Sequence, residues 1–321
     1  MKSRSVSVTG ATGFVGAHLV EAFRERGWSV RAIVRPGSRK PLPDGVERRE
    51  AGLEPTALAS AIAGCDAVVH SAAMIRARDE RELMRVNVEG TRAAVDAANA
   101  AGARLILISS QAAIGAGTPA APAREDDSPR PINAYGRSKL AAEDVVRARA
   151  ATAWTILRPS SVYGPRDRQF LPLYRLAARG LFPLVAPPDM AFTLVHVRDV
   201  ARAVVMAAED PRAAGAAMFV GHGDPQTGEA ILRTIARLVG TTYRPLRVPS
   251  VLVRALGAVG EAMWKVGMRP LVDASRVAEL RAPGFVVDVT RARETIRFVA
   301  EIDIERGFAE THAWYRAQGW L

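Results

Sequence analysis

The sequence predicts an α/β protein in which a doubly wound parallel sheet precedes a smaller, mostly helical C-terminal region. Three observations lead to this prediction. Apolar strand-like runs alternate with helical patterns up to Pro165, a glycine-rich turn separates the first strand from the first helix, and the alternation stops after Pro165. Regular strand–helix alternation is typical of a parallel sheet with helices on both faces.

The length and composition are those of a globular protein. The chain has 321 residues, of which 49% are hydrophobic, and its single cysteine is Cys65. One cysteine excludes a disulfide framework or a cysteine zinc site within the chain, so we expect no metal and a reducing, cytoplasmic location. No signal-peptide pattern precedes the first strand, and no run of about 18 uncharged apolar residues predicts a membrane-spanning helix.

The formal charge of +11 raises the question of an anionic partner such as nucleic acid or a membrane surface. Lysine occurs only at positions 2, 40, 139 and 265, so nearly all the positive charge is arginine, which is scattered along an alanine-rich chain. This pattern favours a compositional bias, and we expect no nucleic acid partner.

The first strand, residues 4–8, leads into three glycines, Gly10, Gly13 and Gly16, and then into a helical pattern from about Phe14 to Arg26. A glycine turn between a strand and a helix allows close backbone approach and presents a helix N-terminus. Together these features predict a pyrophosphate site.

The next strand, Ser29–Val34, is followed by Arg35, where NAD-binding units usually carry an acidic residue for the ribose diol. A guanidinium attracts a 2′-phosphate, which a carboxylate would repel. Ser38, Arg39 and Lys40 lie just beyond. We therefore favour NADP(H) over NAD(H); a solvated basic loop is the alternative interpretation.

The remaining elements complete the alternating pattern. We expect strands at 46–50, 67–73, 104–110, 155–159 and 217–221, and helices at 55–63, 80–101 and 134–150. The range 192–209 is expected to start as a strand and to continue as a helix. Further helices are expected near 229–239, 250–266 and 303–317. These patterns predict a nucleotide-binding domain over 1–165, a substrate-binding insertion over 166–189, a return to the sheet over 190–222 and a mostly helical substrate-binding region over 223–321.

Tyr135 and Lys139 lie four residues apart in the predicted helix 134–150, so their side chains share one face. A neighbouring ammonium favours the phenolate form of a tyrosine, so we expect Lys139 to lower the pKa of Tyr135. Such a pair could pass a proton to or from a substrate oxygen. Taken alone, a Tyr-x-x-x-Lys spacing is also common on surface helices.

The chain resembles the extended short-chain dehydrogenase/reductases, specifically the NAD-dependent epimerase/dehydratase family and its 3β-hydroxysteroid dehydrogenase-like branch. The resemblance rests on motifs that follow the family's order: Thr9–Gly16, Asp66–Ala73, Asn87–Thr91, Ser109-Ser110, Tyr135–Lys139, Leu157–Pro165 and His196–Val200. It implies a Rossmann fold and hydride transfer with a nicotinamide cofactor.

The resemblance also implies a catalytic triad. Ser110 would orient the substrate oxygen, Tyr135 would act as acid or base, and Lys139 would tune the tyrosine and bind the nicotinamide ribose. Ser109 is the alternative hydroxyl, because adjacent strand residues point to opposite faces and only one of the two serves. Asn87 matches an asparagine that supports the site, and helix capping is its alternative role.

Cofactor contacts are carried over in the same way. The residues expected to touch the cofactor are Gly10, Thr12, Gly13, Phe14, Val15, Arg35, Leu53, Ser71, Ala72, Ala73, Tyr135, Lys139, Pro159 and Val162. An aspartate that many relatives have near Gly52 is absent, so adenine would rely on backbone groups near Leu53. The resemblance also implies a homodimer.

The sequence departs from the sugar-nucleotide enzymes of the family. Ile114-Gly115 stands where they often have Tyr-Gly, no arginine lies near Phe192, and the segment 166–189 is apolar. These departures favour an NADP(H)-dependent oxidoreductase of a hydrophobic ketone or secondary alcohol, steroid-like or of an acyl or polyketide type. The alternatives are a sugar-nucleotide epimerase or dehydratase with tightly held NAD, and a non-catalytic cofactor-binding subunit.

The segment 250–266 is predicted as an amphipathic helix of undecided role. Its apolar side chains include Val251, Leu252, Leu256 and Val259. Core packing is the first interpretation, and a lid over the substrate or a membrane-surface contact are the others.

Overall fold

A seven-stranded parallel sheet is the centre of the molecule. The computed structural model describes residues 3–187, 189–268, 270 and 272–321. The strands run in the order β11-β6-β5-β4-β1-β2-β3, and every neighbouring pair is parallel. Their bounds are Ser5–Thr9 (β1), Ser29–Val34 (β2), Glu47–Glu50 (β3), Ala67–His70 (β4), Arg104–Ile108 (β5), Trp154–Pro159 (β6) and Ala216–Val220 (β11). The predicted doubly wound sheet is confirmed.

The strand order reverses between β1 and β4, which are neighbours in the sheet. After β1 the chain adds β2 and β3 on one side, and after β4 it adds β5 and β6 on the other. Ligands of such sheets bind at this switch point, beyond the carboxyl ends of the strands. The glycine turn after β1 and the residues after β4 and β5 therefore reach the same place.

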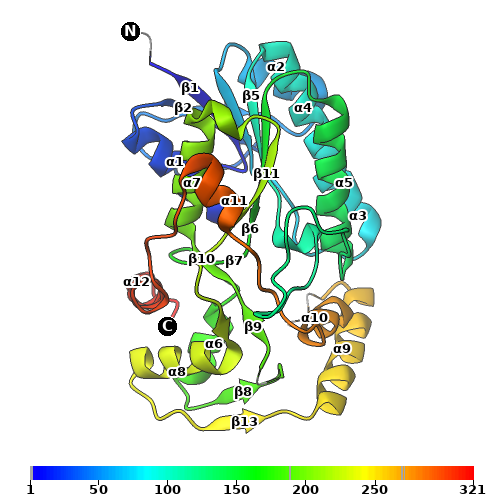
Figure 1. Ribbon diagram of the computed structural model, residues 1–321, viewed down its shortest axis with the longest axis vertical. Helices are drawn as coiled ribbons and strands as arrows, with labels where there is room; N and C mark the ends of the chain where they lie inside the picture. The colour runs from blue at the N-terminus through cyan, green and yellow to red at the C-terminus, as the bar shows by residue number, and fades with distance from the viewer. Residues whose placement is uncertain (1–2, 188, 269, 271) are drawn as a thin grey trace.

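Helices cover both faces of the sheet and enclose two hydrophobic cores (Figure 1). On one face lie α1 (Phe14–Glu25) and α7 (Val197–Glu209), packed through residues such as Leu19 and Val204. On the other lie α2 (Pro55–Ile62), α4 (Gly90–Ala101) and α5 (Ala134–Arg149). The sheet is thus buried on both sides, which explains why its inner strands are nearly continuously apolar.

The helix expected over 80–101 is helical throughout, but it contains a π-helical turn. It consists of α3 (Glu80–Met84), a π-helical turn η1 (Arg85–Glu89) and α4. The π-turn contains Asn87, whose side chain points inward, and α4 begins at Gly90, where a Cβ would lie 2.6 Å from Leu53 Cδ1. Extra turns of this kind frequently occur at functional sites, and periodicity alone does not reveal them.

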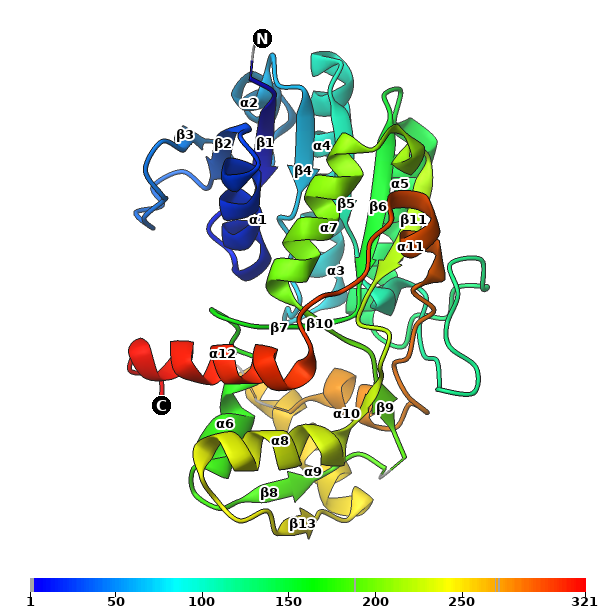
Figure 2. The same cartoon turned by 60° about the vertical axis from the view of Figure 1, so that its left-hand side comes forward.

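The second half of the chain forms a smaller region around its own core, shown in the lower part of Figure 2. Its elements are β7 (Ser161–Tyr163), α6 (Leu171–Ala177), β8 (Phe182–Leu184), β9 (Ala191–Phe192), β10 (Leu194–His196), β12 (Gln226–Thr227), α8 (Gly228–Val239), β13 (Pro245–Arg247), α9 (Ser250–Lys265), α10 (Ala274–Leu280) and α12 (Ile304–Ala317). Two further segments of this half of the chain, η3 (Pro211–Ala213) and α11 (Thr290–Ile296), pack on the main sheet. The predicted helices correspond to α8, α9 and α12. The strand expected at the start of 192–209 corresponds to β10. The other short strands were not predicted, because two or three residues carry too little periodic pattern.

Two parts of the expected domain division need correction. Within 190–222, β11 joins the main sheet, whereas β10 pairs with β7 in a separate two-stranded sheet. Within 223–321, residues 285–298 return to the sheet half: Phe285 bridges to Gly117, and Ile296 and Phe298 join the core under α7. These buried apolar side chains hold the two halves together.

Candidate active site

The glycine turn is packed too tightly for any other residue at two of its positions. A Cβ on Gly16 would lie 2.0 Å from the carbonyl oxygen of Gly10, and Gly10 itself has φ of +68° and lies against the backbone of Ala72. The turn therefore brings the start of α1 against the end of β4. This close approach is what a dinucleotide-binding turn requires.

The N-terminus of α1 is open to an anion. Its N-cap, Gly13, offers no side-chain hydrogen bond, and its first turn holds no acidic residue. The first backbone N–H groups of a helix have no intrahelical acceptor, and the helix dipole favours negative charge there. Thr12, Phe14 and Val15 flank this end, so the turn fits the pyrophosphate that the sequence predicts.

The end of β4 is tied to the end of β1. The Thr9 hydroxyl accepts a hydrogen bond from the Ala72 backbone N–H at 3.2 Å and shares a 2.9 Å hydrogen bond with His70 Nδ1. Burial, followed by the charge of Lys139, lowers the pKa of His70 to about 3, so its imidazole is neutral. Ser71, Ala72 and Ala73 are consequently held beside the glycine turn.

A basic loop folds over the same turn. Arg35 is exposed at the end of β2, and among the described residues its guanidinium has no hydrogen-bond or ion-pair partner. Lys40 reaches further and donates to the Thr12 carbonyl at 3.3 Å. Arg48 steadies the loop by donating to the Ser38 carbonyl at 2.8 Å. Two cations therefore stand near the turn, and Leu53, at the other side of the expected adenine site, packs on Gly90.

Tyr135 and Ser110 meet at the carboxyl end of β5. Tyr135 is in the first turn of α5, and Gly136 allows that turn to approach the η2 turn (Gln111–Ala113): a Cβ there would lie 2.3 Å from the Ala112 carbonyl oxygen. The Ser110 hydroxyl lies close enough to the Tyr135 phenol to act on its pKa. The two side chains could therefore grip one substrate oxygen together.

The prediction that the pKa of Tyr135 is lowered is wrong for the chain without a bound ligand. Burial raises the pKa of Tyr135 to about 12, the Ser110 hydroxyl opposes this, and the Glu279 charge adds to it. Lys139 instead donates a 2.6 Å hydrogen bond to the Ile108 carbonyl, and burial lowers its own pKa to about 8. The phenol is therefore protonated at neutral pH.

Ser109 and Ser110 have different surroundings. Ser109 is buried and donates a 2.6 Å hydrogen bond to Glu143, which is also bound by Arg158 at 2.9 and 2.7 Å and by Arg147 at 2.8 Å. This network links the end of β5, α5 and β6, about two helical turns along α5 from Tyr135. Ser109 is thus occupied by a structural ion pair, and Ser110 is the hydroxyl that faces the phenol.

Asn87 supports the site without facing it. Its amide donates to the Met74 carbonyl at 2.8 Å and to the Ser138 hydroxyl at 2.9 Å, and its oxygen accepts from the Met74 N–H at 2.7 Å. Both functions of the amide are used, so Asn87 joins the loop after β4 to α5 and caps no helix. Its place is that of a positioning residue.

Pro159 and Val162 mark the exit of β6. Pro159 is buried and pairs with Val220 of β11, and Val162 is partly buried in β7, where it pairs with Val195 of β10. They lie at the carboxyl edge of the sheet, the edge from which Ser110 also projects. This position matches the expected nicotinamide side of the site.

The sequence interpretation missed two residues beside Tyr135. Asn133 caps α5 by accepting from the Gly136 N–H at 2.8 Å, and its amide donates to Glu279 of α10 at 2.7 Å. An asparagine before a helical pattern is a readable N-cap signal, so Asn133 could have been found. Glu279 gives no local signal, because it reaches the site only through the fold.

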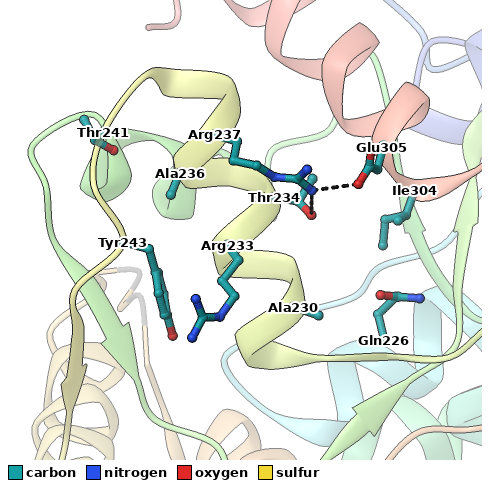
Figure 3. A pocket seen from close by; sticks show the side chains of 10 residues that line it. All are labelled: Gln226, Ala230, Arg233, Thr234, Ala236, Arg237, Thr241, Tyr243, Ile304 and Glu305. Carbon is teal, nitrogen blue, oxygen red and sulfur yellow. Dashed lines mark hydrogen bonds and ion pairs between the residues drawn. The ribbon is translucent and has the colours of Figure 1, made fainter.

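Two surface cavities lie in the smaller region. One, of about 500 Å³ between α8 and α12, is lined by residues including Arg233, Arg237 and Glu305 and by none of the predicted site residues (Figure 3). The other, of about 510 Å³, lies between the β8–β13 pair and the α9–α10 pair. Its lining includes Val277 and Leu280 of α10, the helix that also carries Glu279 to Asn133.

Comparison with known proteins places these features in a family. Residues 6–221 match the NAD dependent epimerase/dehydratase family. The chain is 34% identical to a ceramide reductase of Caulobacter vibrioides, over 98% of this chain and 96% of that protein. It is 29% identical to a 4-hydroxy-2-methyl-3-oxo-4-farnesyl-3,4-dihydroquinoline-1-oxide ketoreductase of Stigmatella aurantiaca, over 94% and 93%.

Among solved structures, MoeE5 in complex with UDP-glucose and NAD has 27% identity and a TM-score of 0.78, covering 98% of this chain and 99% of that one. The glycine turn, the start of α1 and Tyr135 all lie within the residues that the family match spans. The chain belongs to the NAD dependent epimerase/dehydratase family and is an NAD(P)-dependent enzyme of the extended short-chain dehydrogenase/reductase type.

Proposed function

We propose that this enzyme reduces a hydrophobic ketone, or oxidises the matching secondary alcohol, with NADP(H). The observation that carries the proposal is the Tyr135 phenol, which burial keeps protonated, in the first turn of α5 with the Ser110 hydroxyl beside it. When a hydride is added to a carbonyl carbon, the oxygen must receive a proton. A phenol that keeps its proton at neutral pH is suited to supply it.

Each residue then has one task. When bound, the nicotinamide supplies or accepts the hydride. The Ser110 hydroxyl donates a hydrogen bond to the substrate oxygen and orients it, and Tyr135 transfers its proton to that oxygen. Lys139 holds its positive charge at the end of β5, where it stabilises the phenolate that remains after transfer. Asn87 and Asn133 fix the position of α5.

The preference for NADP(H) is supported by the cations beside the glycine turn. Arg35 has a free guanidinium within the described chain, and Lys40 is close enough to bind the Thr12 carbonyl. A 2′-phosphate at the end of β2 would meet these groups where NAD-specific units present a carboxylate. Both cations are exposed, so solvent weakens each interaction.

The apolar composition of 166–189 does not support the preference for a hydrophobic substrate. Leu171 and Phe182 are buried in the core of the smaller region, so they do not report on substrate polarity. The proposal draws on the 510 Å³ cleft beside α10, lined by side chains such as Leu184 and Val277, and on the substrates named for the two reductases above.

A sugar-nucleotide epimerase is the second candidate. MoeE5 is similar over its full length, and a UDP-glucose 4-epimerase of Vibrio cholerae is 27% identical over 96% of this chain. Arg247, Arg254 and Arg281 line the same cleft and could meet a diphosphate. The stacked rings of Phe192 and Phe285, 6.1 Å apart, stand where the relatives of that type tend to have an arginine.

The test is a parallel assay of both reactions. We expect oxidation of NADPH, faster than of NADH, with ketones that become better substrates as they become less polar. Tyr135→Phe should reduce turnover by about 100-fold or more with nearly unchanged NADPH binding. Tyr243→Phe is the matched control, because its hydroxyl has no partner among the described residues and the residue lines the other cavity. Interconversion of UDP-sugars without net NADPH consumption would favour the epimerase instead.

A further inference from the structure

Helix α9 packs with its small residues inward. A Cβ on Gly257 would lie 2.6 Å from Val277 Cγ2, and one on Gly260 would lie 1.9 Å from the Val272 carbonyl oxygen. Val253 is the one large side chain of α9 that is fully buried. The helix therefore uses a narrow glycine face to approach α10, which is the reverse of ordinary amphipathic packing.

The large apolar side chains of α9 face outward. Core packing, the first interpretation of this segment, is wrong for them: each of the following is more than half exposed, namely Val251, Leu252, Leu256, Val259 and, just past the helix, Val266 and Met268. At 100° per residue, Val251, Leu252, Leu256 and Val259 lie within one 140° arc. Helix α9, which lies at the lower right of Figure 1, thus presents a continuous apolar face to the outside.

Basic side chains border this face. Arg254 and Lys265 lie on one flank of α9, and Arg254 also lines the cleft beside α10. Among the described residues, neither has a hydrogen-bond or ion-pair partner for its side-chain charge. The one carboxylate on α9, Glu261, accepts a hydrogen bond from the Ala274 N–H at 3.0 Å.

We propose that the outward face of α9 docks on a membrane surface that contains anionic lipids. An apolar helix face with a basic flank lies in the plane of the interface, the apolar side chains among the acyl chains and the cations at the headgroups. The sixteen residues of α9 would extend about 24 Å along the surface. No helix of the described chain is long and apolar enough to cross a bilayer, so the contact is peripheral.

The other occupants fit the observations less well. A second copy packed symmetrically on this face would bring Arg254 and Lys265 of each chain toward those of the other, which costs free energy. A lid would turn its apolar face toward the protein, whereas α9 turns its glycines that way. An anionic surface satisfies the apolar face and the cations together.

The experiment is flotation of the full chain with vesicles of phosphatidylcholine alone or of phosphatidylcholine with phosphatidylglycerol. Three variants are compared: Leu252→Glu with Leu256→Glu, Arg254→Glu with Lys265→Glu, and Val299→Glu. Val299 is as exposed as Val259, at 57%, but lies between α11 and α12, so it is the matched control. All substituted side chains are exposed, and circular dichroism melting checks that each variant folds.

We expect the wild type to float with phosphatidylglycerol vesicles and to be released by salt. The leucine variant should bind about tenfold or more weakly, the cation variant should lose the phosphatidylglycerol preference, and Val299→Glu should bind as the wild type does. A wild type that stays unbound, a leucine variant that floats equally, or a dimer that the leucine variant abolishes would each overturn the proposal. Because no turnover is measured, the result is independent of the proposed reaction.

Discussion

The Lys139 ammonium donates a 2.6 Å hydrogen bond to the carbonyl oxygen of Ile108, the last residue of β5. The side chain is only 2% exposed. Its charge lies beside neutral His70 and one helical turn from Glu143, whose carboxylate is bound by Arg158, Arg147 and Ser109. Lys139 is thus a buried cation held by a strand end.

Replacing Lys139 with methionine should remove a pH dependence of stability. Burial lowers the pKa of Lys139 from 10.5 to about 8, so between these values the unfolded chain binds more protons than the folded one. The wild type should therefore gain stability relative to Lys139→Met as pH rises from about 8 to about 10.5, by about 2–3 kcal/mol. Urea unfolding of both proteins across this range measures the difference. A constant difference would show that the ammonium is not buried.

The two serines should separate activity from stability. Ser110→Ala should reduce kcat by about tenfold or more and leave the melting temperature unchanged, because Ser110 faces the phenol. Ser109→Ala should lower the unfolding free energy by about 1–2 kcal/mol, because Glu143 loses a buried hydrogen bond, with turnover nearly intact. Steady-state kinetics and thermal melts check both variants. The opposite pattern would exchange their roles.

Arg35→Gln should weaken NADPH binding selectively. Removing the guanidinium beside the glycine turn should raise the NADPH Kd by about tenfold and change the NADH Kd by less than about twofold. Fluorescence titration with each cofactor measures both constants. Arg24→Gln, an exposed arginine in the last turn of α1, is the control for the loss of one positive charge. Equal weakening of both cofactors would remove Arg35 as the 2′-phosphate ligand.

Gly16→Ala should disrupt the turn itself. The new Cβ would lie 2.0 Å from the Gly10 carbonyl oxygen, so the backbone must shift, at a cost of about 3 kcal/mol. Both stability and affinity for either cofactor should fall. Gly223→Ala meets nothing within 4 Å and serves as the control. Unchanged melting of Gly16→Ala would mean that the turn adjusts freely.

Local patterns accounted for the sheet but not for everything around it. The strands, α1, α5 and the glycine turn follow from periodicity and glycine spacing within about 20 residues. The π-turn at Asn87 was missed, because it lies within an otherwise regular helix, and the hydrogen bonds of Asn87 to Met74 and Ser138 form only in the fold. The return of residues 285–298 to the sheet was also missed, since its bridge partner, Gly117, lies far away in the chain.

The amino-acid pattern alone was enough to predict the doubly wound sheet, the glycine turn between β1 and α1 and the residues that meet at the end of β5, because these depend on spacing along one or two elements. Only the tertiary structure decided which serine faces Tyr135, in which direction the pKa of Tyr135 moves, and that α9 turns its large apolar side chains outward. Burial and charge depend on partners such as Asn133 and Glu279, 146 positions apart. No local pattern records which distant segment will pack against a given face.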